Sequence, residues 1–225
     1  MKRDPLKATV LSSKLIPNAT PKMVQDLIAA SGLDIEYDPK YHRSLALVTA
    51  DCDDVTYTAL DEATKKADVQ VIYARSFYGG AANANTKLAG EILGVLAGPN
   101  PAEAKAGLDV LVDFVENEAW FISANEDDTI PYYAHCISRT GTYLSTSNNI
   151  EVGSALAYLI APPLEAMYAI DAAVKAADVS IVALYNPPSE TNFGGGLLTG
   201  TQSACKAACD AFAAAVEFVA DNPLE

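Results

Sequence analysis

The chain has 225 residues, of which 50% are hydrophobic and 20% are charged, so it is long enough for one large core or for two cores of about 100 residues each. Its 15 lysines and arginines stand against 29 aspartates and glutamates, a formal net charge of -14, which excludes nucleic acid and anionic membranes as favourable partners. Residues 1–10 lack the apolar run of a signal peptide, and prolines and carboxylates interrupt the most apolar tract, 155–174. We therefore expect a cytoplasmic protein that does not span a membrane.

An internal repeat sets the order of the predicted elements. The sequence Asp-Glu-Ala-Thr-Lys-Lys-Ala-Asp-Val at 61–69 returns as Asp-Ala-Ala-Val-Lys-Ala-Ala-Asp-Val at 171–179, 110 residues later (171 − 61). Such a repeat indicates that one folding unit occurs twice in the chain.

Each copy is predicted to run strand, helix, strand, loop, glycine-rich strand and helix, because apolar residues recur at strand or helix spacing between Gly and Pro clusters. In the first copy these elements cover 45–49, 55–66, 69–73, 74–85, 90–98 and 101–115. In the second copy they cover 155–160, 164–176, 179–184, 184–195, 194–200 and 202–219. Segments 8–27 and 120–145 precede the copies as strand-rich lead-ins. The predicted architecture is therefore two α+β domains, 1–117 and 118–225.

The repeated motif, between two strands and ahead of an Ala-rich helix, resembles the bacterial microcompartment (BMC) shell domain. Over nearly the whole chain, further strings resemble the L-type shell proteins of ethanolamine-utilization microcompartments. These strings are Thr-Ala-Asp-Cys-Asp-Asp-Val-Thr-Tyr at 49–57, Ala-Gly-Glu at 89–91, Ala-Gly-Pro-Asn-Pro-Ala-Glu at 97–103, Ser-Arg-Thr-Gly at 138–141, Ala-Pro-Pro-Leu-Glu-Ala at 161–166, Pro-Pro-Ser-Glu-Thr-Asn at 187–192 and Cys-Lys-Ala-Ala-Cys at 205–209. Segment 29–40 departs from the family pattern by its greater length.

The resemblance implies an α+β fold of two tandem, circularly permuted BMC domains, each an antiparallel sheet flanked by helices. It implies a structural shell protein that forms a pseudohexagonal homotrimer and tiles with other shell proteins around enzymes that use coenzyme B12 to split ethanolamine. It also implies a gated central pore for a metabolite or cofactor. No bound cofactor is expected, and coenzyme B12 is a candidate for a molecule that passes or binds the pore.

Carboxylates gather where the first helix of each copy begins. Asp51, Asp53 and Asp54 precede one helix, and Glu165 lies at the start of the other. Helix capping accounts for such residues on its own. The resemblance instead assigns Asp53, Glu91, Phe121 and Glu165 to a small pore that binds ethanolamine. Carboxylates and an aromatic face suit that ligand, because they favour an ammonium ion through charge-assisted hydrogen bonds and cation-π attraction.

The loops 74–85 and 184–195 are rich in Gly, Asn and Pro and also contain bulky aromatic residues. Ordinary surface loops have the same composition. The resemblance implies that these loops line the trimer axis and move to open or close the central pore. The pore-loop residues predicted on this basis are Tyr78, Gly79, Gly80, Tyr185 and Phe193.

Lys65 and Lys175 occupy the last turn of the two equivalent helices, where a cation is favoured by the exposed carbonyl groups. A solvated helix end explains them simply. The resemblance implies instead a contact at the edge between neighbouring tiles.

Cys205 and Cys209 are four residues apart on one helical face, and His135 and Cys136 are conceivable further ligands of a soft metal. Four scattered ligands are a weak metal signal, so we expect no metal and interpret the cysteines as packing residues.

The sequence does not favour an enzyme. Its two histidines, His42 and His135, lack an evident Ser or Cys partner, and the glycines near residue 195 fit neither the Rossmann nor the P-loop spacing. Two alternatives to a shell tile remain at this point: a regulator that binds amines and does not tile, and a hydrolase that uses Asp53 and Glu165.

Overall fold

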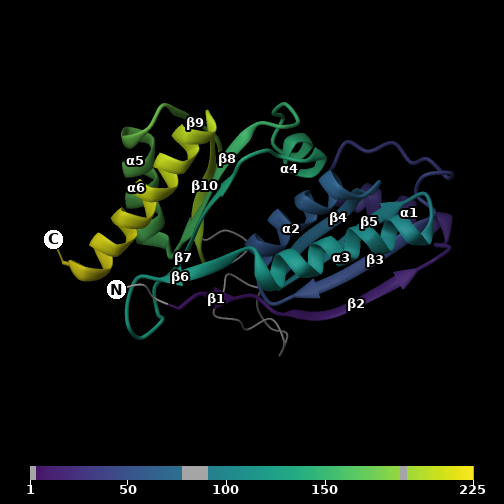
Figure 1. Ribbon diagram of the computed structural model, residues 1–225, viewed down its shortest axis with the longest axis horizontal. Coiled ribbons are helices and arrows are strands. Elements are labelled where there is room, and N and C mark those ends of the chain that lie inside the picture. The colour runs from purple at the N-terminus through teal and green to yellow at the C-terminus, as the bar shows by residue number, and fades with distance from the viewer. Residues whose placement is uncertain (1–3, 78–90, 188–191, 225) are drawn as a thin grey trace.

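The computed structural model describes residues 4–77, 91–187 and 192–224, and its first half is built on a four-stranded antiparallel sheet. The elements are β2 (Val10–Ile16), α1 (Pro21–Ser31), β3 (Ser44–Ala50), α2 (Asp53–Lys66), β4 (Gln70–Phe77), β5 (Glu91–Gly98) and α3 (Pro101–Asn117). The strands lie in the order β2-β3-β5-β4. Helices α2 and α3 pack against each other, and Figure 1 shows both in the half of the molecule that contains this sheet.

The second half is built on a six-stranded antiparallel sheet. Its elements are β6 (Trp120–Ser123), β7 (Pro131–Ile137), α4 (Thr142–Ser147), β8 (Ala155–Ala161), α5 (Pro163–Ala176), β9 (Val179–Tyr185), β10 (Gly194–Gly200) and α6 (Gln202–Asp221). The strands lie in the order β1-β6-β7-β8-β10-β9, where β1 (Leu6–Lys7) comes from the N-terminal region. Helices α5 and α6 lie side by side at one end of the molecule (Figure 1).

The two halves repeat one another element by element, as the sequence repeat predicts. The order β7-β8-β10-β9 reproduces β2-β3-β5-β4, and α2 and α5 are both 14 residues long and begin 110 residues apart (163 − 53). The match extends to single hydrogen bonds: Ala19 N donates to Arg43 O at 2.8 Å, and Thr140 N donates to Ser154 O at 2.8 Å. The predicted α+β fold of two tandem domains with antiparallel sheets is confirmed.

The lead-in segments contain the predicted strands and, in addition, the starts of two helices. Segment 8–27 contains β2 and most of α1, and segment 120–145 contains β6, β7 and the start of α4. Helix α1 begins with Pro21 and ends at Ser31, and the residue that caps it, Gly32, has a φ of 74° in the left-handed region that glycine adopts readily. Helix α4 has only six residues, too few for a clear helical periodicity in the sequence.

The helices that follow β5 and β10 begin at residues whose side chains cap them. The Asn100 side chain accepts hydrogen bonds from Ala102 N and Glu103 N and so caps α3, and the Thr201 side chain accepts from Ala204 N and caps α6. The two capped helices are equivalent in the repeat, and each covers one face of its own sheet.

The halves share a hydrophobic core instead of merely touching. One cluster of buried residues joins Val55 and Leu60 of α2 to Tyr133 of β7 and Leu156 of β8. The face of the second sheet that carries Tyr133 and Tyr158 is therefore covered by α2 of the first half. This contact positions the candidate functional site, because the residues on both sides of it are held by a continuous core.

Candidate functional site at the junction of the two halves

A cavity of about 770 Å³ opens at the junction between the two halves. Such a volume is within the usual range for small-molecule sites. Both halves supply its walls, with carboxylates, an arginine and several tyrosines among them. The lining residues include Asp53, Asp54, Tyr57 and Arg75 from the first half and Tyr143, Tyr158, Tyr185 and Phe193 from the second.

Asp53 and Asp54 open helix α2 and are both buried, with exposed fractions of 5% and 6%. The Asp53 Oδ1 atom accepts a hydrogen bond of 2.9 Å from Asp54 N, and Asp54 Oδ1 accepts one of 2.9 Å from the Tyr158 hydroxyl. Asp51 is used differently, because its Oδ1 accepts from Thr9 N at 2.6 Å. Helix capping does not explain the acidic group, because the N-cap residue of α2 is Cys52, which makes no side-chain capping hydrogen bond. Asp51 instead holds the N-terminal segment, and Asp53 and Asp54 face the cavity.

Burial makes the two cavity carboxylates weak acids. Loss of solvent raises the pKa of Asp53 well above its ordinary value, and the neighbouring charge of Asp54 raises it further. Burial likewise raises the pKa of Asp54 to about 7, although the hydrogen bond from Tyr158 favours the ionised form. A cation in the cavity would stabilise the ionised carboxylates, so these groups are prepared for a positively charged ligand.

Glu91 lies at the same end of the first sheet as the start of α2. It is the first residue of β5 and is opposite Phe77, while the next residue of β5, Ile92, is opposite Ala50 at the end of β3. Glu91 is 2% exposed. Its Oε2 atom has no hydrogen-bond partner among the residues that the structure describes. A buried oxygen without a partner is costly and is a feature expected of a ligand site.

Phe121 belongs to an aromatic group behind the cavity. It is fully buried in β6 and stacks on Tyr133 at a centroid distance of 5.3 Å. It also contacts Phe193 at 6.2 Å. Because Phe193 and Tyr185 line the cavity, two of the predicted pore-loop residues lie close to the predicted ligand residues. The other three, Tyr78, Gly79 and Gly80, lie outside the described residues.

Glu165 is not brought to this cavity. It is half-buried in the first turn of α5 and is not among the described residues that line the cavity. The structure thus places Asp53 in the cavity, Glu91 and Phe121 in elements next to it, and Glu165 on the equivalent helix of the other half.

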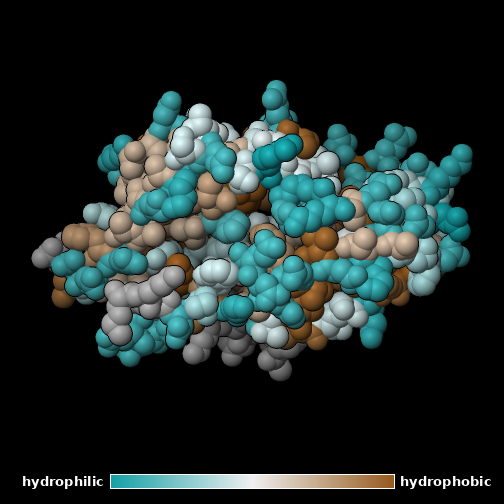
Figure 2. Space-filling model, in the orientation of Figure 1, coloured by the Kyte–Doolittle hydropathy of each residue, from teal (hydrophilic) through white to brown (hydrophobic). Residues whose placement is uncertain are grey.

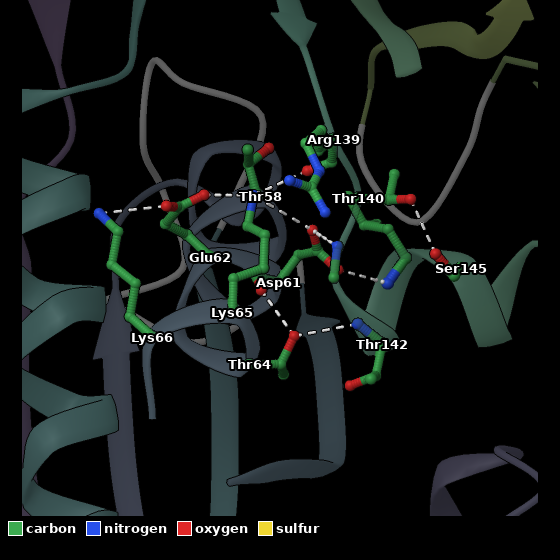
Figure 3. Close-up of polar contacts among 12 residues, drawn as sticks. Thr58, Asp61, Glu62, Thr64, Lys65, Lys66, Arg139, Thr140, Thr142 and Ser145 are labelled. Atoms are coloured by element: carbon green, nitrogen blue, oxygen red, sulfur yellow. Dashed lines mark hydrogen bonds and ion pairs between the residues drawn. The ribbon is translucent and has the colours of Figure 1, made fainter. Parts of the chain in front are cut away.

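A second polar group closes the junction nearer the C-terminal end of α2, and sequence analysis missed its central residue, Asp61. The buried Asp61 carboxylate accepts hydrogen bonds from Gly141 N at 2.7 Å and from Leu144 N at 2.9 Å, both at the start of α4. Figure 3 shows the Asp61 carboxylate directed at these amides, with Thr64 Oγ1 accepting from Thr142 N beside it. One feature of the sequence could have pointed to Asp61, because this residue begins the repeated motif at 61–69.

The two predicted tile-edge lysines have different surroundings. Lys65 Nζ donates to Arg139 O at 3.0 Å across the junction, and it also pairs with Glu62 (Figure 3). Lys175 has a side chain that is 74% exposed and pairs with Asp171 on its own helix. The proposed role at the tile edge stays a prediction for both.

The conceivable metal ligands do not converge. His135 stacks on Tyr133 at a centroid distance of 5.4 Å, whereas Cys136 packs against the cluster that contains Cys205 and Cys209. Adjacent residues of a strand point to opposite faces of its sheet, so His135 cannot join the cysteines. Within the described parts of the chain, no group of three or more histidines, cysteines or carboxylates is arranged to hold a metal ion.

Comparison with known proteins agrees with this architecture. The model of the BMC domain matches residues 161–223. The solved structure of the ethanolamine utilization protein EutL from Leptotrichia buccalis is 70% identical, covers 100% of both chains and superposes with a TM-score of 0.90. The bacterial microcompartment shell protein EutL of Clostridium perfringens is 62% identical over 224 residues, which are 100% of this chain and 99% of that protein. The trimeric shell protein PduB, at 17% identity and a TM-score of 0.73 over 95% of this chain and 89% of its own, shares the fold alone.

The fold and the domain match together define a shell protein of bacterial microcompartments, a structural component and not an enzyme. Within that class, the chain belongs to the EutL family. Its place is the microcompartment shell. None of the helices in the described segments is long and apolar enough to cross a membrane.

Proposed function

We propose that the protein forms a ring of three chains that tiles, with other shell proteins, the wall of a compartment for ethanolamine catabolism. The observation that carries this proposal concerns the helix face that joins the two halves. That face is buried on α2, whereas the equivalent face of α5 is exposed. The 110-residue shift makes Leu164, Tyr168 and Asp171 of α5 the equivalents of Asp54, Thr58 and Asp61 of α2.

The equivalent faces differ sharply in exposure. On α2, Asp54, Thr58 and Asp61 are 6%, 3% and 0% exposed because the second half covers them. On α5, Leu164 and Tyr168 are 65% and 50% exposed. Figure 2 shows apolar residues gathered over the end of the molecule formed by α5 and α6. An exposed apolar face of this kind is typical of a protein–protein contact.

The receiving face for α5 is the matching surface of the first half in another chain. In the second half, Tyr158 and Leu144 contact α2, and their repeat equivalents are Leu47 (158 − 111) and Met23 (144 − 121). Met23 is 37% exposed and Leu47 is half-buried. Each chain thus carries one donor face and one receiving face. Head-to-tail contacts of this type generate closed rings when the rotation closes, and three chains of two domains give six positions.

The ring is tested by replacing one residue of the α5 face. We expect Leu164→Glu to convert the trimer to a monomer in analytical ultracentrifugation, because a carboxylate would be buried against Met23 and Leu47. Val152→Glu is the matched control, because Val152 is 64% exposed and lies outside α5. A Leu164→Glu variant that remains trimeric would contradict the proposed contact.

We also propose that ethanolamine binds at the junction through Asp53, Glu91 and Phe121, and that Glu165, which lies outside the described lining of the cavity, is a fourth ligand residue from helix α5. The buried Glu91 oxygen, which has no hydrogen-bond partner in the described parts of the chain, and the cavity carboxylates support this site, because an ammonium group would satisfy them with charge-assisted hydrogen bonds. Calorimetric titration of ethanolamine tests each residue. Asp53→Asn and Glu91→Gln should weaken binding at least about tenfold, and undiminished affinity in Glu165→Gln would remove that residue from the site.

The central pore is proposed to be gated by loops 74–85 and 184–195, and its solute is a metabolite or a cofactor such as coenzyme B12. The composition of the second loop supports this role, because it combines Gly, Asn and Pro with the bulky side chains of Tyr185 and Phe193. Crosslinking the loops in assembled shells should stop passage of a large solute, and continued passage would count against gating.

A regulator that binds amines without tiling is the alternative. Negative-stain microscopy of the concentrated protein separates the two functions, because a tile forms extended sheets and a regulator remains as discrete particles. The same assay on a variant with both Lys65 and Lys175 replaced by alanine tests their proposed edge contact, which predicts that the sheets are lost.

A further inference from the structure

Three of the four cysteines meet between β7 and α6, away from the junction cavity. Cys136 lies in β7 opposite Ala157 of β8, and Ala157 in turn is opposite Leu198 of β10. Helix α6 packs on β7 and β8 and directs Cys205 and Cys209 toward them. The Cys136 side chain packs against the same cluster. A sheet residue and two residues of the covering helix therefore bring three thiols together.

The three thiols have different contacts. Cys205 Sγ is directed at Leu198 O at 3.9 Å, and it is fully buried. Cys136 Sγ reaches Gln202 O at 3.8 Å at the first turn of α6 and is partly exposed. Cys209 is 3% exposed and belongs to the buried cluster against which Cys136 packs. The reactive arrangement is thus a pair: an accessible thiol on the strand and a buried one behind it.

The surroundings of Cys136 favour its thiolate. The neighbouring Cys209 thiol lowers the pKa of Cys136 to about 7, and the nearby Lys206 ammonium acts in the same direction. Asp210 opposes them, but it pairs with Lys206 on the surface of α6. The neighbouring Cys136 and burial raise the pKa of Cys209. One member of the pair is therefore the nucleophile and the other retains its proton, as in other reactive thiol pairs.

We propose that Cys136 and Cys209 form a dithiol site that exchanges reversibly with small-molecule disulfides. The Cys136 thiolate attacks one sulfur of the disulfide, which forms a mixed disulfide and releases one small thiolate. Cys209 then loses its proton to solvent and attacks the Cys136 sulfur, which releases the second thiolate and leaves a Cys136–Cys209 disulfide. The protein loses two electrons and two protons, and the small disulfide is reduced to two thiols.

The product would join β7 covalently to α6. That bond closes a chain segment that contains α4, β8, α5, β9 and β10. Such a crosslink restricts the unfolded chain and stabilises the second half against unfolding.

The test uses the full-length protein and oxidised glutathione as the probe. Wild type should lose the mass of two hydrogen atoms, regain it with dithiothreitol, and give a single crosslinked peptide pair that contains Cys136 and Cys209. Cys209→Ala should stop at a glutathione adduct on Cys136, and Cys136→Ala should react at least about tenfold more slowly. Cys205→Ala is the matched control and should form the same disulfide as wild type.

Two results would overturn the proposal. One is a wild-type protein that keeps all its thiols, or that stops at the adduct, under conditions in which its circular dichroism spectrum is unchanged. The other is a crosslink that uses Cys205 in place of Cys209. Circular dichroism and thermal unfolding of each alanine variant establish that a lost reaction reflects a lost thiol and not a lost fold.

Discussion

The carboxylate of Asp61 in α2 accepts a hydrogen bond of 2.7 Å from the backbone amide of Gly141, 80 residues further along the chain. Leu144 N donates to the other carboxylate oxygen. A buried carboxylate in the first half thus holds the start of a short helix in the second half. In the repeat, the corresponding residue of α5 is Asp171, whose side chain is 64% exposed.

The first prediction concerns Asp61 itself. Asp61→Asn should lower the free energy of unfolding by about 1–3 kcal/mol, because one amide of α4 loses its acceptor and faces an NH₂ group in a buried position. Urea denaturation measures the change. Asp109→Asn, at an Asp whose side chain is 62% exposed on α3, is the control and should change stability by less than about 0.5 kcal/mol. Equal effects of the two variants would show that the Asp61 contacts do not stabilise the junction.

The second prediction concerns the partner of Asp61. A Cβ atom at Gly141 would lie 2.2 Å from Thr64 Oγ1 and 2.6 Å from Asp61 O, so Gly141→Ala must push α4 away from α2. We expect a loss of about 1–3 kcal/mol, and faster hydrogen exchange at the start of α4. Thr142→Ala is a suitable comparison, since its amide still donates to Thr64. Wild-type exchange in Gly141→Ala would mean that the junction absorbs the extra methyl group.

The third prediction concerns the hydroxyl group of Tyr158. Tyr158→Phe removes the hydrogen bond to buried Asp54 and should cost about 1–2 kcal/mol. Tyr168→Phe is matched in chemistry, but Tyr168 is 50% exposed, so its hydroxyl should matter little to the free energy of unfolding. Thermal and urea unfolding of both variants provide the measurement, and a neutral Tyr158→Phe would argue against a stabilising contact.

The fourth prediction concerns pH. Because the pKa of Asp54 is raised to about 7 in the folded protein, the folded state keeps a proton that the unfolded state releases near pH 4. Stability from this group is therefore fully present below about pH 4 and is lost as the pH rises through about 7. Asp54→Asn cannot ionise but keeps an acceptor for Tyr158.

The measurement is the urea midpoint at about pH 5 and about pH 8. The decline between the two should be shallower in Asp54→Asn than in wild type. A residual decline is expected from Asp53, whose pKa is raised in the same direction. Asp26→Asn is the control, because its side chain is exposed on α1, and its urea midpoint should decline as much as that of wild type. An equal decline in wild type and Asp54→Asn would refute the conclusion that Asp54 titrates with a raised pKa.

Much of the fold is predictable from the sequence because local signals and the repeat agree. The sequence predicts that the helices after β3 and β8 start at residues 55 and 164, and in the structure they start at Asp53 and Pro163. The glycine-rich strand 194–200 has the predicted bounds. The helices α1 and α4 were missed, since the second is one and a half turns long and offers little periodicity.

The site is less predictable because it depends on contacts between the halves. The sequence places carboxylates at two helix starts, but only the packing of α2 against the second sheet buries Asp53 and Asp54 and leaves the α5 face open. The role of Asp61 can be recognised only when the structure shows that Gly141 lies opposite it across the junction. Tertiary contacts between residues so far apart in the sequence leave no local pattern.

The N-terminal strand has a consequence for how the chain can be divided. Leu6 and Lys7 pair with Phe121 and Trp120, so the first residues of the polypeptide complete the outer border of the sheet that the later residues build. A fragment that starts at residue 118 would lose this cover and leave the backbone of β6 unpaired along that border. Unpaired strand borders recruit other chains and promote aggregation, so the proposed halves 1–117 and 118–225 are interlocked units that should be expressed together.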